Sequence, residues 1–178
     1  MFLALLPALR QVHAADAIEA RDVRIERQVG TEGWELSADF HLPLPDRLEE
    51  AVNRGVALYF VLEFELVRPR WYWWDERAAS VSQTWRLGYH ALTRQYRLTL
   101  DGGFSQTFGS LDEALRTLSR VRGWQVLAPG QASPGTEYQA QLRLRLDASM
   151  LPKPFQVTAI TNRDWTLQSA WTRFPFVP

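Results

Sequence analysis

The sequence predicts a mainly β domain, an antiparallel β-sandwich of immunoglobulin-like architecture with two short helices. Three observations lead to this prediction. Apolar and polar residues alternate with a period of two over most of the chain, and the connections between these segments are of hairpin length. The 178 residues, 46% of them hydrophobic, are enough for one packed core and too few for two. An α+β sheet covered on one face by the helices is the alternative.

The chain begins with an apolar run, Phe2–Leu9, followed by a short polar stretch that ends in Val12-His13-Ala14. A β-branched residue at −3 (Val12) and a small residue at −1 (Ala14) of a cut after Ala14 are typical of a signal peptide, although the usual basic start is missing. The run is too short to span a bilayer, and Pro7 disfavours a buried helix. We therefore expect residues 1–14 to be a signal peptide, truncated at its start, and residues 15–178 to form a single exported, periplasmic β-sandwich domain.

The first two strands are expected at 22–29 and 34–42, where apolar residues occupy every second position. A four-residue hairpin turn at 30–33 joins them. Segment 42–55 changes to helical spacing, with Asp46 as the expected N-cap and Gly55 as the stop. The sequence thus predicts a hairpin followed by a short helix.

Residues 56–68 carry the strongest strand pattern in the chain. The segment is almost unbroken in apolar residues at first and then alternates. This pattern is typical of a central strand that emerges from cover. Further strands are expected at 83–92, 94–101 and 104–108.

Residues 110–123 are predicted to form the second helix. Ser110 and Glu113 have the spacing of a capping box, an apolar stripe follows, and Gly123 is the expected end. The remaining expectations are a short strand at 124–127, a loop at 128–136, a strand at 137–147, a break at 151–155 and a returning strand at 164–174.

Charge and cysteine content exclude several classes of function. Lys and Arg together number 20, as do Asp and Glu, so the chain lacks the basic excess that drives nucleic-acid binding. The chain has no cysteine, which excludes disulfides, thiolate nucleophiles and cysteine-based metal sites.

The sequence contains no strong catalytic signature. His41 and His90 lie on polar positions of strands, and no metal-ligand, nucleophile-elbow or phosphate-loop motif occurs. We expect no metal and no cofactor. Glu63 and Glu65 lie about 7 Å apart on one strand face, within reach of glycosidase geometry. A hydrolase of an envelope polymer, using this pair or Asp75 and Glu76, is therefore the alternative function.

The most unusual feature is the segment "VRPRWYWWDERAA" (67–79), with three tryptophans and a tyrosine in four consecutive positions. These side chains either close one end of the core, with some stacking on arginines, or form an exposed aromatic-arginine surface for a partner. We expect both, part anchor and part contact surface. The predicted binding residues are Arg70, Trp71, Tyr72, Trp73, Trp74, Asp75, Arg77, Arg86, His90 and Arg94.

Four stretches together resemble a proteobacterial family known as domain of unknown function number 4390. They are "YFVLEFELVRPRWYWWDERAA", "WRLGYHALTRQYRLTL", "GSLDEALRTLSRVRGW" and "LPKPFQVTAITNRDWTLQSAW". The resemblance covers about residues 20–174. It implies an exported, periplasmic, single-domain protein, often encoded beside a membrane-bound sensor histidine kinase, and it carries no established activity.

These observations together predict a non-enzymatic binding module of the cell envelope. The expected partner is a protein, such as a sensor kinase to which the module is an accessory. Nucleic acid is not expected, and any membrane contact is peripheral. A purely structural envelope component is a third possibility, for which an open edge strand that invites pairing would be the sign.

Overall fold

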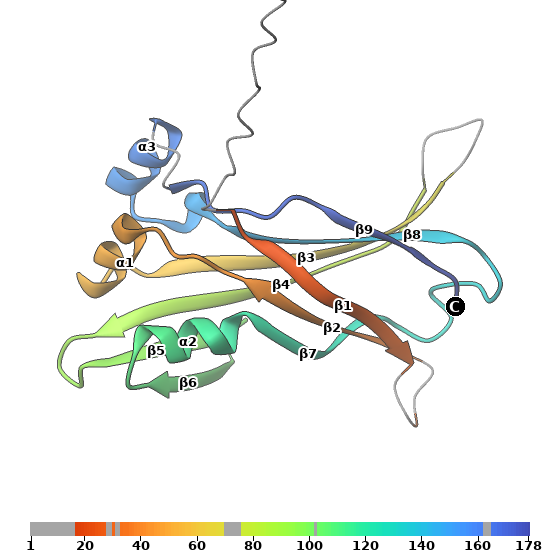
Figure 1. Cartoon of the computed structure of the whole chain (residues 1–178), viewed down its shortest axis with the longest axis horizontal. Helices are drawn as coiled ribbons and strands as arrows, with labels where there is room; N and C mark the ends of the chain where they lie inside the picture. The colour runs from red at the N-terminus through yellow and green to blue at the C-terminus, as the bar shows by residue number, and fades with distance from the viewer. Residues whose placement is uncertain (1–16, 28–29, 31–32, 70–75, 102, 162–164) are drawn as a thin grey trace, which may run out of the picture.

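The backbone of the chain pairs into two antiparallel sheets (Figure 1). The computed structural model describes residues 17–27, 30, 33–69, 76–101, 103–161 and 165–178. The smaller sheet has the strand order β1-β2-β7, and the larger sheet has the order β6-β5-β4-β3-β8-β9. The strands are β1 (Glu19–Arg27), β2 (Trp34–His41), β3 (Leu58–Arg68), β4 (Glu76–His90), β5 (Gln95–Leu100), β6 (Phe104–Phe108), β7 (Arg120–Leu127), β8 (Tyr138–Leu146) and β9 (Thr172–Phe176).

Short helices accompany the sheets. They are α1 (Asp46–Asn53), α2 (Leu111–Leu118), α3 (Lys153–Thr161) and the short 3₁₀ helix η1 (Ala148–Met150). The helices α1 and α2 each bury an apolar side in the core, through Leu48, Ala51 and Val52 and through Leu111, Ala114 and Leu118 respectively. Within the described residues, no helix is both long and apolar enough to cross a membrane.

One core joins the two sheets. Leu36, Ala38 and Phe40 of the smaller sheet belong to the same buried cluster as Leu62 and Phe64 of the larger sheet. A parallel bridge between Ile18 and Ser169 also links the start of β1 to the segment that leads into β9. The smaller sheet therefore packs over the inner face of the larger one.

The predicted class, a mainly β domain of two antiparallel sheets, is confirmed. Strand β3 is central, as its apolar pattern predicts, because it pairs with β4 on one side and with β8 on the other. Over the described residues the strands divide six and three between the sheets, whereas a constant immunoglobulin domain divides them four and three. The larger sheet reaches six strands because the consecutive hairpins β3–β4, β4–β5 and β5–β6 extend it on one side of β3.

The second helix ends earlier than predicted. It stops at Leu118, and β7 begins at Arg120, inside the segment expected to be helical. The Ser119 hydroxyl donates to the Leu115 carbonyl at 2.6 Å at the helix end, and Val121 pairs with Ala38 of β2. Gly123, read as a helix stop, has φ +60° within β7, next to an irregularity in the β2–β7 register. The glycine marks a β-bulge instead.

Three further expectations need correction. Pro45, rather than Asp46, is the N-cap of α1, and no side chain caps this helix. Helix α3 begins inside the predicted break at 151–155 and ends before the predicted last strand at 164–174. Pro152 just before the helix and Pro154 in its first turn made the segment look like a loop. Strand β4 starts at Glu76, well before residue 83, because its first half pairs with the outer half of β3.

Candidate functional site

Strict alternation in β3 creates a polar outer face on the larger sheet. Leu62 and Phe64 are fully buried on the inner face, so Glu63 and Glu65 point outward. Their neighbours across the sheet are Ser82 and Ser80 in β4 and Arg143 and Gln141 in β8. The pairing register therefore brings charged residues far apart in the sequence onto one surface.

Glu63 lies between two arginines of β8. Its Oε2 accepts from Arg143 Nε at 2.8 Å and Nη2 at 2.6 Å, and its Oε1 accepts from Arg145 Nε at 3.2 Å. The Glu63 side chain is only 21% exposed, so water screens these ion pairs less than pairs at an open surface. The carboxylate thus fixes the direction of both guanidinium groups.

An aromatic residue completes this arrangement. The guanidinium carbon of Arg143 lies 4.4 Å from the ring centroid of Trp171, in the segment before β9. A cation over an indole face is attracted by the ring quadrupole. Arg143 is therefore held by a carboxylate on one side and by an aromatic ring on the other.

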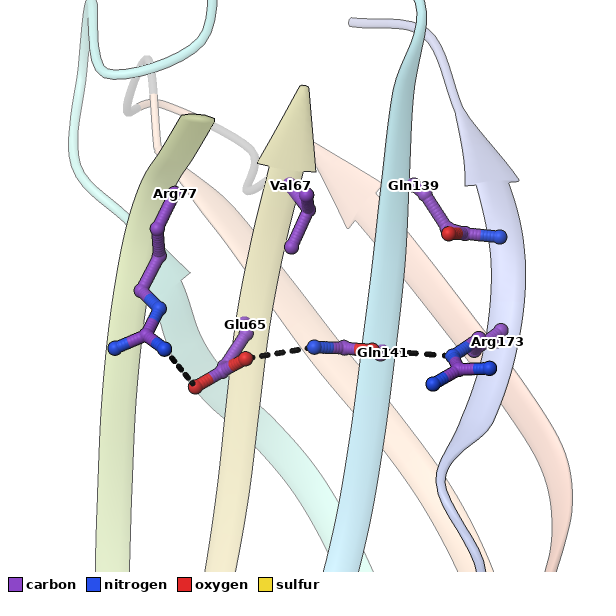
Figure 2. A pocket seen from close by; sticks show the side chains of 6 residues that line it. All are labelled: Glu65, Val67, Arg77, Gln139, Gln141 and Arg173. Carbon is purple, nitrogen blue, oxygen red and sulfur yellow. Dashed lines mark hydrogen bonds and ion pairs between the residues drawn. The ribbon is translucent and has the colours of Figure 1, made fainter. Parts of the chain in front are cut away.

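Glu65 anchors a second row of polar side chains, shown in Figure 2. Its carboxylate accepts from Gln141 Nε2 at 2.6 Å and pairs with Arg77 Nη2 at 3.4 Å, while Arg173 Nε donates to Gln141 Oε1 at 3.2 Å. The row crosses β4, β3, β8 and β9. Together with Val67 and Gln139 it lines a depression of about 580 Å³ in the outer face.

At the other end of β8, Asp147 is held in its ionised form. Burial alone would raise the pKa of this carboxyl, but hydrogen bonds from the Ser149 hydroxyl and backbone N–H, together with the Arg145 guanidinium, lower the pKa below its ordinary value. The hydrogen bonds measure 2.6 Å and 3.1 Å, and Arg145 Nη1 lies 3.5 Å away. Asp147 therefore ties η1 to the charged outer face.

We call this surface the outer-face network. By alternation and pairing, the described residues place more arginines than carboxylates on it. Its arginines are Arg77, Arg86, Arg97, Arg143, Arg145 and Arg173, and its carboxylates are Glu63, Glu65, Asp101 and Asp147. The face is therefore net positive on a chain of zero formal charge.

Most of the predicted aromatic patch lies outside the described residues, namely Arg70, Trp71, Tyr72, Trp73, Trp74 and Asp75. Arg77 is described and lines the depression. Arg68 and Glu76, which pair with each other, flank the undescribed stretch. The Trp-rich segment is therefore joined to the same end of the sheet as the Glu65 row.

The other predicted residues lie towards the far end of β4. The Arg86 guanidinium donates to the Tyr59 hydroxyl at 3.2 Å, and His90 Nδ1 lies 3.2 Å from the Thr93 hydroxyl. Arg94 occupies the β4–β5 turn with φ +53°. Thirteen residue-to-residue steps along β4 separate Arg77 from His90, so these two residues are about 43 Å apart, and the structure does not bring them together.

Sequence reasoning overlooked Arg143, Arg145, Arg173 and Trp171 as members of the site. The alternation of β8 already pointed both of its arginines outward, but nothing local indicated which strand would face them. The pairing of Glu63 with Arg143, eighty positions apart, depends on the β3–β8 register.

The first carboxylate pair of the hydrolase alternative, Glu63 and Glu65, belongs to the outer-face network. Glu63 accepts from two arginines, and Glu65 from an arginine and an amide. Of the other pair, Asp75 lies outside the described residues, and Glu76 begins β4. Both carboxylates of the described pair are therefore engaged in ion pairs or hydrogen bonds on this face.

These features define a class of protein: a mainly β domain of two antiparallel sheets with an arginine-rich outer face. The family model described as "Domain of unknown function (DUF4390)" matches residues 15–175. The chain belongs to this family, as the resemblance of its motifs indicates. A search of curated proteins and a search of solved structures found no match.

Proposed function

We propose that the chain is a non-enzymatic binding module of the cell envelope that contacts a protein partner through the outer-face network. The observation that carries the proposal is the pair of guanidinium groups, Arg77 and Arg173, that line the depression at Glu65 and contact Glu65 and Gln141. Arginine held in place loses less side-chain entropy when it binds, so such a surface is preorganised for recognition.

The chemistry of the surface indicates the kind of partner. Arg77 and Arg173 project from a net-positive face and can donate to carboxylates in a fork geometry. Arginine and tryptophan are also the residue types that contribute most at protein interfaces. An acidic protein surface is therefore the proposed partner, with the Trp-rich segment 70–75 as the aromatic part of the contact.

We propose the extracytoplasmic part of a membrane sensor histidine kinase as this partner, with the chain as its accessory. Support comes from the family's association with such kinases and from the signal-peptide pattern of residues 1–14. Export predicts a mature chain that begins at Ala15, which mass spectrometry of the periplasmic fraction would measure. A cytoplasmic chain that keeps residues 1–14 would contradict this localisation.

Capture in intact cells tests the partner. A photoreactive residue at Ser82, on the outer face, and another at Trp74 should both crosslink the same protein. The same photoreactive residue at Gln125, exposed on β7 of the smaller sheet, is the control. Equal capture from Gln125, or capture of no envelope protein from the other two positions, would refute the proposed surface.

A matched charge reversal separates binding from folding. Arg77→Glu should weaken binding to the captured partner by about tenfold or more, as expected for a cation at the interface. Arg21→Glu is the control, since Arg21 is 60% exposed and pairs with Glu19, while Arg77 is 63% exposed and pairs with Glu65.

The double change of Trp73 and Trp74 to Ala should abolish partner pull-down with little change in melting temperature. Loss of the fold would instead indicate that these residues are core.

A further inference from the structure

Strand β6 forms an open border of the larger sheet (Figure 1). Four of its five residues are exposed, and Phe104 is 66% exposed. Helix α2, which follows β6 in the chain, buries Leu111, Ala114 and Leu118 in the core. In an antiparallel ladder every second residue points its N–H and C=O away from the partner strand, so two or three residues of β6 offer both groups to a further strand.

The other border strands carry features that block such pairing. Among the described residues, β1 contains six charged side chains, β7 contains Arg120 and Arg122, and β9 contains Arg173 and Pro175. Charges and prolines are the usual protection of an exposed edge. Strand β6 reads FSQTF and has neither.

The sequence of β6 reads almost the same in both directions. Phe104 and Phe108 stand at its ends, Ser105 and Thr107 stand next to them, and Gln106 is at the centre. If two copies pair antiparallel about Gln106, phenylalanine meets phenylalanine, serine meets threonine, and glutamine meets glutamine. Aromatic pairs and hydroxyl pairs are favourable cross-strand neighbours.

We propose that β6 pairs with β6 of a second copy of this chain, in an antiparallel dimer with its two-fold axis at Gln106. Such an interface is isologous and closed, as in most homodimers. It joins the two larger sheets into one continuous sheet with both outer-face networks on the same side. The inference rests on the edge strand alone and does not depend on the proposed function.

Sedimentation of the purified full chain tests the dimer. We expect the mass to rise with concentration from that of the 20.5 kDa chain towards twice that value. Gln106→Lys should raise the dissociation constant by about tenfold or more, because two like charges would lie directly opposite each other. Gln125→Lys, the same change at an exposed position of the β7 edge, should leave it unchanged.

A single cysteine gives a second readout, since the chain has none of its own. Gln106→Cys should form a disulfide-linked dimer on mild oxidation, because directly opposed residues lie within disulfide range. Gln125→Cys should remain largely monomeric. A wild-type chain that stays monomeric at all concentrations, or a dimer that Gln106→Lys leaves intact, overturns the proposal. Protection of the β6 amides from exchange only after a different protein is added would also overturn it.

Discussion

The guanidinium group of Arg143 is held between Glu63, which accepts from its Nε at 2.8 Å, and the indole ring of Trp171, whose centroid lies 4.4 Å from Cζ. Because Glu63 belongs to β3 and Trp171 to the segment before β9, these contacts fix the last segment of the chain against β8 and β3. A surface cation that is held in this way is part of the architecture as well as part of the proposed contact surface.

We predict that Trp171→Ala destabilises the fold by about 1–2 kcal/mol through loss of the cation–π contact and of apolar burial. For a chain of this length that corresponds to a fall in melting temperature of roughly 2–8 °C. Arg143→Lys should keep the charge but lose the flat stacking and the fork geometry, so it should lose part of the same stability. Equal melting temperatures for all three proteins would show that the stack contributes nothing.

Asp147 should make stability depend on pH in the acid range. Its pKa is lowered in the folded chain, so the contribution is fully present above the unfolded value of about 3.9 and is lost as the pH falls through the folded pKa. Asp147→Asn removes this charge, and its deficit relative to wild type should be present at pH 7 and shrink below about pH 4. Denaturant unfolding at several pH values measures it; a deficit independent of pH would contradict the charge-based account.

The N-termini of α1 and α2 provide a matched comparison, because only α2 has a side-chain cap. The Ser110 hydroxyl accepts from the Glu113 N–H at 3.3 Å at the start of α2, whereas no side chain caps α1. Ser110→Ala should therefore cost about 1 kcal/mol. Asp46→Ala should cost only a few tenths of a kcal/mol, through loss of a charge in the first turn of α1. Chemical denaturation compares the two, and a larger effect at Asp46 would mean that this residue acts as the cap after all.

Since both sheets share one core, deleting core side chains on either sheet should weaken the same unfolding transition. Leu36 of β2 and Leu62 of β3 are both fully buried. Each Leu→Ala change should cost about 2–5 kcal/mol. Tryptophan fluorescence and far-UV circular dichroism should give coincident transitions for both variants. Separate transitions in Leu36→Ala would indicate that the smaller sheet unfolds on its own.

Alternation predicted β8 almost residue by residue, because a strand with one buried face must place an apolar side chain at every second position. Tyr138, Ala140 and Leu142 are buried as expected. The end of α2 was harder to predict, since Gly123 is equally suited to a helix stop and to a β-bulge. The pairing of β7 with β2 decided between them.

The sequence by itself determined the β class, the buried and exposed positions of strands such as β3 and β8, the central place of β3 and the family of this chain. Each of these follows from local spacing or from contiguous motifs. Only the tertiary structure decided which charges meet. The outer-face network joins β3, β4, β8 and β9 through a register set by burial of the opposite face, and a shift of one residue would reverse every side chain. That constraint acts between strands tens of residues apart, so no local pattern contains it.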